Sequence, residues 1–225
     1  PPSELVNNEP IKYMNKSTDE IAKILGEKGI SADKEIVLYD NGSSKYSGRM
    51  YWELKYMGAK NVKILDGELT AWKAGRKPIT KTPTKPTPTT FTANIQPQYL
   101  AKMDDVMKAT AGGNYVIIDA RTSEEYAGTD EETSLRRGHI PGAVNIDYKL
   151  LLDSKGKLKS KEELAEIYAA KGVTSDKTVI VYCATSVRAG IEFMALSSIL
   201  EYPNVKLYDG AFTEWQTSES NKVVN

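Results

Sequence analysis

Short apolar runs alternate with amphipathic stretches along the second half of the chain. Residues 179–182 are four β-favouring residues in a row, which predicts a strand buried on both faces. Residues 189–200 place apolar side chains at helical spacing, which predicts a helix soon after that strand. Strand and helix patterns alternate every 20–30 residues or so, about the rhythm of βαβ units in a parallel sheet. The expected fold class is therefore α/β, with mainly parallel sheets flanked by helices.

The pattern also repeats itself at a constant offset. Residues 17–72 and 160–215 align without insertion or deletion, and equivalent positions differ by 143 (160 − 17). Each copy begins with a capping-box pattern, at Ser17 or Ser160, which predicts the start of an amphipathic helix. Shared residues further along are Asn61-Val62-Lys63 with Asn204-Val205-Lys206, Asp66-Gly67 with Asp209-Gly210, and Trp72 with Trp215. The repeat predicts two similar domains, each with its own sheet and with its tryptophan in the core.

A proline-rich stretch separates the two copies. Residues 78–90 contain four prolines, which remove hydrogen-bond donors and favour an extended, semi-rigid linker. We therefore expect a first domain over residues 1–77, the linker over 78–90 and a second domain over 91–225. Subtracting 143 from Asp119 or His139 gives positions before residue 1, so the first copy lacks a counterpart of this strand and Gly-His turn. We expect a preceding segment of the protein to supply them.

Composition and charge narrow the class of function. The chain has 225 residues, of which 40% are hydrophobic and 27% charged, and its formal net charge is zero. A balanced charge gives no electrostatic reason to expect nucleic acid or an anionic membrane as a partner. No apolar run reaches the roughly 20 residues that a membrane-spanning helix needs. One cysteine forms no internal disulfide, which leaves the compartment open between cytoplasm and periplasm, and one histidine with one cysteine argues against a structural zinc site.

The cysteine, Cys183, directly follows the apolar strand. The turn 183–188 then leads into the predicted helix, so turn N–H groups, the helix dipole and Arg188 converge on the thiol. These positive charges favour the thiolate, which is the nucleophilic form. A single cysteine after an apolar strand is also typical of a small core residue. Its place at the carboxyl end of a strand in an α/β sheet favours the nucleophile.

The first copy carries no such group. Position 40, equivalent to 183, is Asp40, and a carboxylate can form neither a thiolate nor a persulfide. We expect the first domain to be catalytically inactive, with Asp40 capping its own loop.

These motifs together resemble the tandem-domain rhodaneses, the thiosulfate and mercaptopyruvate sulfurtransferases. The resemblance rests on Asp119-Ala120-Arg121, on 138–143 (Gly-His-Ile-Pro-Gly-Ala), on the cysteine loop, and on Asp209-Gly210 followed by Trp215. It implies two rhodanese-like domains, with Cys183 as the catalytic sulfur acceptor. It also implies that Arg121 and Arg188 bind an anionic substrate, whereas Asp119 and His139 are structural. The other loop residues, whose N–H groups would surround the sulfur, are Ala184, Thr185, Ser186 and Val187.

The resemblance implies a reaction that needs no metal or organic cofactor, because the intermediate is a cysteine persulfide. The expected donor is thiosulfate, since Arg188 at the end of the loop suits an anionic donor, and the mercaptopyruvate type of loop is absent. The acceptor would be cyanide or another thiophile, such as a thiol or an acceptor protein. One loop position departs from the family: Ser186 stands where many members have glycine, so we expect an altered loop shape or an added hydroxyl donor.

Two alternatives remain open. A cysteine phosphatase of this fold needs five residues between cysteine and arginine, whereas only four separate Cys183 from Arg188. The other alternative, from a different functional class, is a non-catalytic rhodanese module that carries sulfur or binds partners. The retention of Cys183, Arg121 and Arg188 argues against this second alternative.

Overall fold

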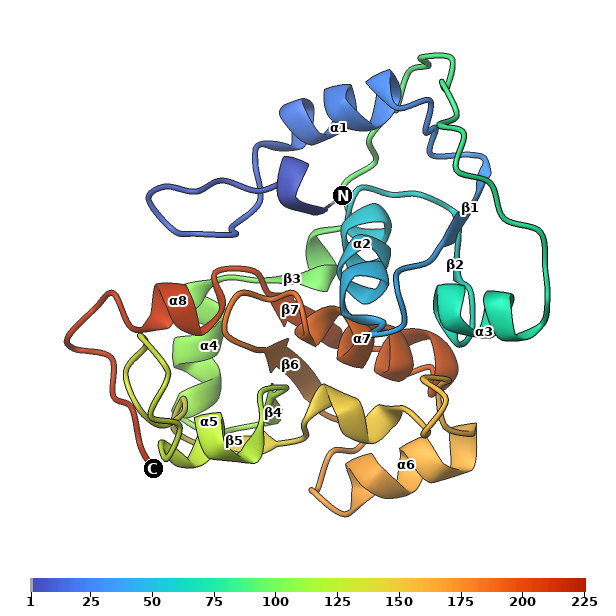
Figure 1. Cartoon of the computed structure of the whole chain (residues 1–225). Coiled ribbons are helices and arrows are strands. Elements are labelled where there is room, and N and C mark those ends of the chain that lie inside the picture. The colour runs from blue at the N-terminus through green and yellow to red at the C-terminus, as the bar shows by residue number, and fades with distance from the viewer. Residues whose placement is uncertain (1) are drawn as a thin grey trace.

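The structure is a computed structural model, and it describes residues 2–225 in two parts that each contain a parallel sheet (Figure 1). The first sheet has two strands, β1 (Glu35–Leu38) and β2 (Asn61–Ile64). The second has five strands in the order β3-β7-β6-β4-β5, and every pair in it is parallel. The expected α/β class with separate parallel sheets is therefore confirmed.

Helices accompany both sheets. The first part contains the short 3-10 helix η1 (Pro2–Glu4), α1 (Thr18–Glu27), α2 (Lys45–Tyr56) and α3 (Glu68–Ala74). The strands of the second part are β3 (Leu100–Ala101), β4 (Tyr115–Asp119), β5 (Ala143–Asn145), β6 (Thr178–Tyr182) and β7 (Val205–Tyr208). Its helices are η2 (Pro97–Tyr99), α4 (Met103–Thr110), α5 (Ser123–Ala127), η3 (Tyr148–Leu151), α6 (Lys161–Ala169), α7 (Ala189–Met194), η4 (Ala195–Ile199) and α8 (Ala211–Trp215).

The repeat in the sequence is a repeat in the structure. Elements α1, β1, α2, β2 and α3 correspond in order to α6, β6, α7 with η4, β7 and α8. Both capping boxes form: the hydroxyls of Ser17 and Ser160 accept hydrogen bonds from the backbone N–H three residues later. The expectation of two copies with matching elements is confirmed.

The expectation for the two tryptophans is confirmed for only one of them. Trp215 is buried, with 3% of its surface exposed, and packs with β6 and α8. Trp72 is 37% exposed, and its indole N–H donates to the carbonyl of Pro78. Trp72 lies on α3 beside a sheet of only two strands, which provides too little surface to cover it.

The predicted helix over 189–200 forms, but its second half is wider than an α-helix. Element η4 is a π-helix, in which the N–H of Leu200 bonds the carbonyl of Ala195 five residues earlier. The hydroxyl of Ser197 donates to the carbonyl of Phe193, four residues back. Such side-chain bonds to the preceding turn compete with the helical ladder and bend helices, which accounts for the irregular turn.

Residues 78–90 have no regular secondary structure and are exposed. Their end passes over α1, where the N–H of Thr89 bonds the carbonyl of Gly26 at 2.8 Å. The boundaries 77/78 and 90/91 stay a prediction. No helix in residues 2–225 is long and apolar enough to cross a membrane.

The two parts meet mainly where α2 crosses α7, side by side in the middle of the molecule (Figure 1). Glycines permit the crossing. A Cβ added to Gly48 would lie 2.6 Å from the backbone nitrogen of Ile191, and one added to Gly190 would lie 2.4 Å from that of Arg49. Because α7 begins directly after the cysteine loop, this contact brings the first part against the loop.

Candidate active site

Cys183 lies at the carboxyl end of β6, the middle strand of the five-stranded sheet. The residue is fully buried and has no accessible surface. The start of α8 anchors the loop: the N–H of Phe212 bonds the carbonyl of Cys183 at 3.0 Å, and the N–H of Thr213 bonds that of Ala184 at 3.1 Å. The structure therefore places the thiol where strand, loop and helix meet, as the sequence predicts.

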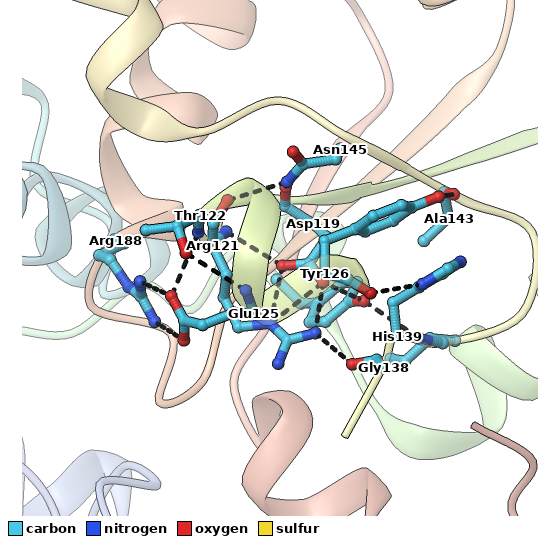
Figure 2. Close-up of polar contacts among 12 residues, drawn as sticks. Asp119, Arg121, Thr122, Glu125, Tyr126, Gly138, His139, Ala143, Asn145 and Arg188 are labelled. Atoms are coloured by element: carbon cyan, nitrogen blue, oxygen red, sulfur yellow. Dashed lines mark hydrogen bonds and ion pairs between the residues drawn. The ribbon is translucent and has the colours of Figure 1, made fainter. Parts of the chain in front are cut away.

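Arg188 closes the cysteine loop and forms a bidentate ion pair with Glu125 of α5 (Figure 2). The two N···O distances are 2.5 and 2.8 Å. Burial by itself would lower the pKa of Arg188, but the hydrogen bond to Glu125 and the proximity of Cys183 raise it overall. Arg188 is therefore a permanent cation next to the sulfur.

Arg121 has a different environment. Its Nε and Nη2 bond the carboxylate of Asp119 at 2.6–3.0 Å, and Nη2 also bonds the carbonyl of Gly138 (Figure 2). The guanidinium packs 4.2 Å above the ring of Phe212. Burial would lower the pKa of Arg121, yet the hydrogen bond and charge of Asp119 raise it overall. Its Nη1 has no hydrogen-bond partner among residues 2–225, so this nitrogen is the part of Arg121 that remains for a ligand.

The two arginines are linked electrostatically through Glu125. Desolvation raises the pKa of this carboxyl, but Arg188, through a hydrogen bond and its charge, and to a lesser extent Arg121 lower it overall. The site thus contains two guanidiniums and two carboxylates, Asp119 and Glu125. Both guanidiniums are thus already paired with carboxylates in this structure, Arg188 with Glu125 and Arg121 with Asp119.

Asp119 and His139 are both engaged by neighbouring groups of the second domain. Asp119 also accepts from the hydroxyl of Tyr182 at 2.7 Å. The imidazole Nδ1 of His139 lies 2.8 Å from the carbonyl of Tyr126, and the ring stacks on that of Tyr126 with centroids 3.6 Å apart (Figure 2). These contacts support the expectation that neither residue is a base.

The other loop residues differ in how far they are exposed. Ala184, Thr185 and Val187 are half-buried, whereas Ser186 is fully buried. Val187 also lines a cavity of about 430 Å³ between the two parts of the molecule, beside Asp40. The cavity is rich in tyrosine, and its other lining residues are Pro2, Ser3, Val6, Tyr13, Tyr39, Tyr46 and Arg49.

Ser186 adopts a left-handed backbone conformation with φ of 56°. This is the region that glycine enters at little cost and serine enters with strain. Its hydroxyl lies 2.8 Å from the carbonyl of Thr185 and 3.0 Å from that of Asp209, and it accepts a hydrogen bond from Arg49. The departure from the family pattern therefore keeps a glycine-like conformation and adds a hydroxyl group.

The equivalent loop of the first copy shows how such a loop holds a negative charge. The carboxylate of Asp40 accepts four backbone N–H bonds at 2.8–3.2 Å, from Gly42, Ser43, Ser44 and Tyr46. Asp40 therefore caps its own loop, as expected.

Sequence reasoning missed two residues at this site. Glu125 was hidden because its pairing with Arg188 joins positions 63 residues apart. Tyr148 of η3 is buried, and charged groups of both copies act on its phenol. Burial raises the pKa of Tyr148, with Arg188 opposing and Asp147, Asp40 and Cys183 adding to the rise. No sequence signal marks Tyr148, but Glu125 occupies the third position of a capping box begun by Thr122.

Comparison with known proteins decides the family. The model of the rhodanese-like domain matches residues 5–75 and 102–218. The chain belongs to the rhodanese family. It is 36% identical to a 3-mercaptopyruvate sulfurtransferase of Escherichia coli K12, over 92% of this chain and 73% of that protein. It is 35% identical to a putative thiosulfate sulfurtransferase of Haloferax volcanii (88% of this chain, 71% of that protein) and to the sulfur carrier protein TtuD of Thermus thermophilus (88% and 74%).

The fold also matches solved structures. The structure of wild-type EanB superimposes with a TM-score of 0.89 at 21% identity, over 99% of this chain and 57% of the EanB chain. The chain thus spans less than two thirds of EanB, and the likeness concerns the fold. The family match and the sequence relatives show that this is a tandem rhodanese of the sulfurtransferase family.

Proposed function

We propose that this rhodanese transfers the outer sulfur of thiosulfate to a thiophilic acceptor through a persulfide on Cys183. The observation that carries the proposal is the placement of Cys183 at the start of a loop that Arg188 closes, with the guanidinium next to the thiol. The relatives named as thiosulfate and mercaptopyruvate sulfurtransferases support the reaction class.

The first half-reaction is a displacement at sulfur. The Cys183 thiolate attacks the outer sulfur of thiosulfate, the S–S bond of the donor breaks, and its electron pair leaves with sulfite. Arg188 faces the charge that develops on the leaving group, and the free Nη1 of Arg121 is proposed to bind another oxygen. Loop N–H groups, from Ala184 to Arg188, would stabilise the anionic persulfide as the N–H groups around Asp40 stabilise its carboxylate.

The second half-reaction restores the enzyme. Cyanide or a thiol attacks the outer sulfur of the persulfide, the new bond to sulfur forms, and the Cys183 thiolate leaves. No other group has to be oxidised or reduced. Because Cys183 has no accessible surface, both reactants can reach its sulfur only after neighbouring side chains move.

Thiosulfate is the proposed donor because the Arg188 guanidinium lies next to the thiol, and we propose that Nη1 of Arg121 binds a second oxygen of this small dianion. The pairing of these arginines with Glu125 and Asp119 weakens this preference, because the dianion must compete with Glu125 for Arg188. The test is steady-state cyanolysis with thiosulfate or 3-mercaptopyruvate as donor and Cys183→Ser as control. A higher kcat/KM for thiosulfate supports the proposal. A higher kcat/KM for mercaptopyruvate overturns the choice of donor. No turnover with either donor overturns the proposal that the protein is an enzyme.

Sulfur carriage is the second candidate, favoured by the likeness to the Thermus thermophilus sulfur carrier protein. A carrier would form the persulfide but pass it to a protein rather than to cyanide. Persulfide formation without cyanolysis would therefore favour the carrier. A phosphatase has no support from the geometry, since the Cys183–Arg188 loop has one residue fewer than that reaction needs.

A further inference from the structure

The first domain, which has Asp40 in place of the cysteine, places one side chain directly on the cysteine loop. Arg49 of α2 is 1% exposed, and its Nη1 donates to the hydroxyl of Ser186, the fourth residue of the loop. Its Nη2 donates to a carboxylate oxygen of Asp209 at 2.7 Å and to the side-chain oxygen of Asn15. The guanidinium also lies 4.6 Å from the ring of Trp52. The buried guanidinium of Arg49 thus bridges the two domains at the cysteine loop.

Arg49 contacts the residue of the cysteine loop whose backbone is strained. Ser186 has φ of 56° and no accessible surface. Its hydroxyl can donate its single proton to the carbonyl of Thr185 at 2.8 Å, to the carbonyl of Asp209 at 3.0 Å, or to the Asp209 carboxylate at 3.3 Å. While the hydroxyl donates to one of these oxygens, its lone pair accepts from Arg49. Both the backbone and the side chain of Ser186 are therefore fixed, although a serine in this conformation is strained.

Arg49 can reach Ser186 because the helices touch at glycines. Gly48 and Gly190 leave no room for a Cβ, and the backbone nitrogen of Arg49 lies against Gly190, two residues beyond the loop. Asp209 completes the arrangement: it precedes α8, whose first turn holds the carbonyl of Cys183 through the N–H of Phe212. The contacts of Arg49 therefore reach the loop from two sides.

We propose that Arg49 is a positioning residue for the reaction: by holding Ser186 in its left-handed conformation, it fixes the loop around the Cys183 sulfur. The inference rests on the proposed function for its kinetic consequence, and on the contacts alone for its structural one. It gives the first domain a role in catalysis even though Asp40 replaces the cysteine there. It also explains how a serine can stay at a position whose backbone conformation suits glycine.

The decisive test is a double-mutant cycle between positions 49 and 186. Arg49→Lys keeps a positive charge for Asp209 but cannot bridge Asp209 and Ser186 with a fixed fork. In Ser186→Gly, the backbone adopts positive φ at little cost, so the loop no longer depends on Arg49. We expect Arg49→Lys to slow persulfide formation from thiosulfate by about tenfold in the native background, and by less than about twofold in the Ser186→Gly background.

Tyr51→Phe is the matched control. Tyr51 lies on the same helix, and its hydroxyl bonds that of Ser198 across the same domain contact without touching the loop. If Arg49 only stabilised the domain contact, Tyr51→Phe would slow the reaction as well, and Arg49→Lys would cause equal losses in both backgrounds. Either result overturns the proposal.

A readout that needs no donor separates this inference from the proposed function. Amide hydrogen exchange of residues 184–188, measured on the unmodified protein, reports the order of the loop directly. Arg49→Lys should speed exchange there by about tenfold, and Tyr51→Phe should not. Unchanged exchange after Arg49→Lys contradicts positioning even if the enzyme is active. Faster exchange in Arg49→Lys, in a protein that forms no persulfide, would support the positioning role of Arg49 and contradict the proposed enzymatic function.

Discussion

Asp209 of the second domain accepts a hydrogen bond from the backbone N–H of Asn15 in the first, at 2.9 Å. The same contact exists in reverse: Asp66 accepts from the backbone N–H of Leu158 at 3.1 Å. Both pairs are related by the repeat offset, since 66 + 143 is 209 and 15 + 143 is 158. The two copies therefore bind one another through equivalent residues, and the contact at Asp209 lies beside the cysteine loop, because Asp209 also bonds the hydroxyl of Ser186.

Removing the nucleophile and removing its counterpart should have opposite results. Cys183→Ser should abolish persulfide formation, because no other cysteine is present. Asp40→Ala should leave turnover within several-fold but lower the free energy of unfolding by about 1–3 kcal/mol, since the backbone N–H groups around it lose a charged acceptor. Urea unfolding and cyanolysis measure the two effects. Loss of turnover in Asp40→Ala at unchanged stability would mean that the first domain takes part in the chemistry through Asp40.

Arg188 should contribute to kcat/KM for thiosulfate. Arg188→Ala should lower kcat/KM for thiosulfate by about ten- to a hundredfold, because a hydrogen bond to a charged group is worth about 1.5–3 kcal/mol. The variant also leaves Glu125 without its ion pair, so Arg188→Ala with Glu125→Gln is the companion that removes this second effect. A neutral effect of Arg188→Ala in both backgrounds would contradict the anion-binding role.

Glu125 allows a test of the charge balance. If thiosulfate shares Arg188 with this carboxylate, Glu125→Gln should lower KM for thiosulfate, because a neutral amide still accepts from Arg188 but does not repel the dianion. KM for 3-mercaptopyruvate, which has one carboxylate, should fall less. A KM for thiosulfate that rises in Glu125→Gln would mean that the ion pair orients Arg188 for binding rather than competing with the donor.

Arg121 needs a control of its own. Arg121→Ala should also lower kcat/KM for thiosulfate by about ten- to a hundredfold if Nη1 binds the donor. It would at the same time leave the buried Asp119 without its ion pair, with the Tyr182 hydroxyl as a remaining donor. The comparison is therefore with Arg121→Ala combined with Asp119→Asn, at matched stability by urea unfolding. Recovery of activity in the double variant would show that Arg121 is structural.

The sequence was sufficient to predict the parts of the fold that depend on local pattern. The capping boxes at Ser17 and Ser160, the buried strand before Cys183 and the offset of the repeat all reappear in the structure. The interior position of Trp72 was predicted wrongly, because its burial depends on how much sheet surrounds it. The contact of Arg49 with Ser186 could not be predicted, since its equivalent position in the second copy is Glu192 and the pattern gives no hint of pairing.

Two enclosed carboxyl groups should make stability depend on pH. Burial is the largest cause that raises the pKa of Glu53 and of Glu192 to about 8, opposed by Arg49 and by Tyr168 respectively. In the unfolded chain both groups titrate near the usual 4.5. Between about pH 5 and pH 8 the folded state therefore binds more protons, and the free energy of unfolding falls as pH rises, by at most about 1.4 kcal/mol per pH unit for each group.

Glu53→Gln and Glu192→Gln should each flatten this profile. Urea unfolding at about pH 5.5, 7 and 8.5 measures the free energy of unfolding of each variant and of the wild type. The difference between variant and wild type should grow as the pH rises toward about 8 and stay constant above that pH. Profiles that run parallel to the wild type would show that the two carboxyls are ionised in the folded protein at neutral pH.

The central claim is that Cys183 accepts sulfur, and intact-mass spectrometry tests it most directly. The protein is incubated with thiosulfate, desalted without reductant and weighed before and after addition of cyanide, with Cys183→Ser treated in parallel. We predict that the wild type gains the mass of one sulfur atom, that cyanide removes it, and that Cys183→Ser gains nothing. A wild type whose mass does not change with thiosulfate or with 3-mercaptopyruvate, or an equal gain in Cys183→Ser, would contradict the account.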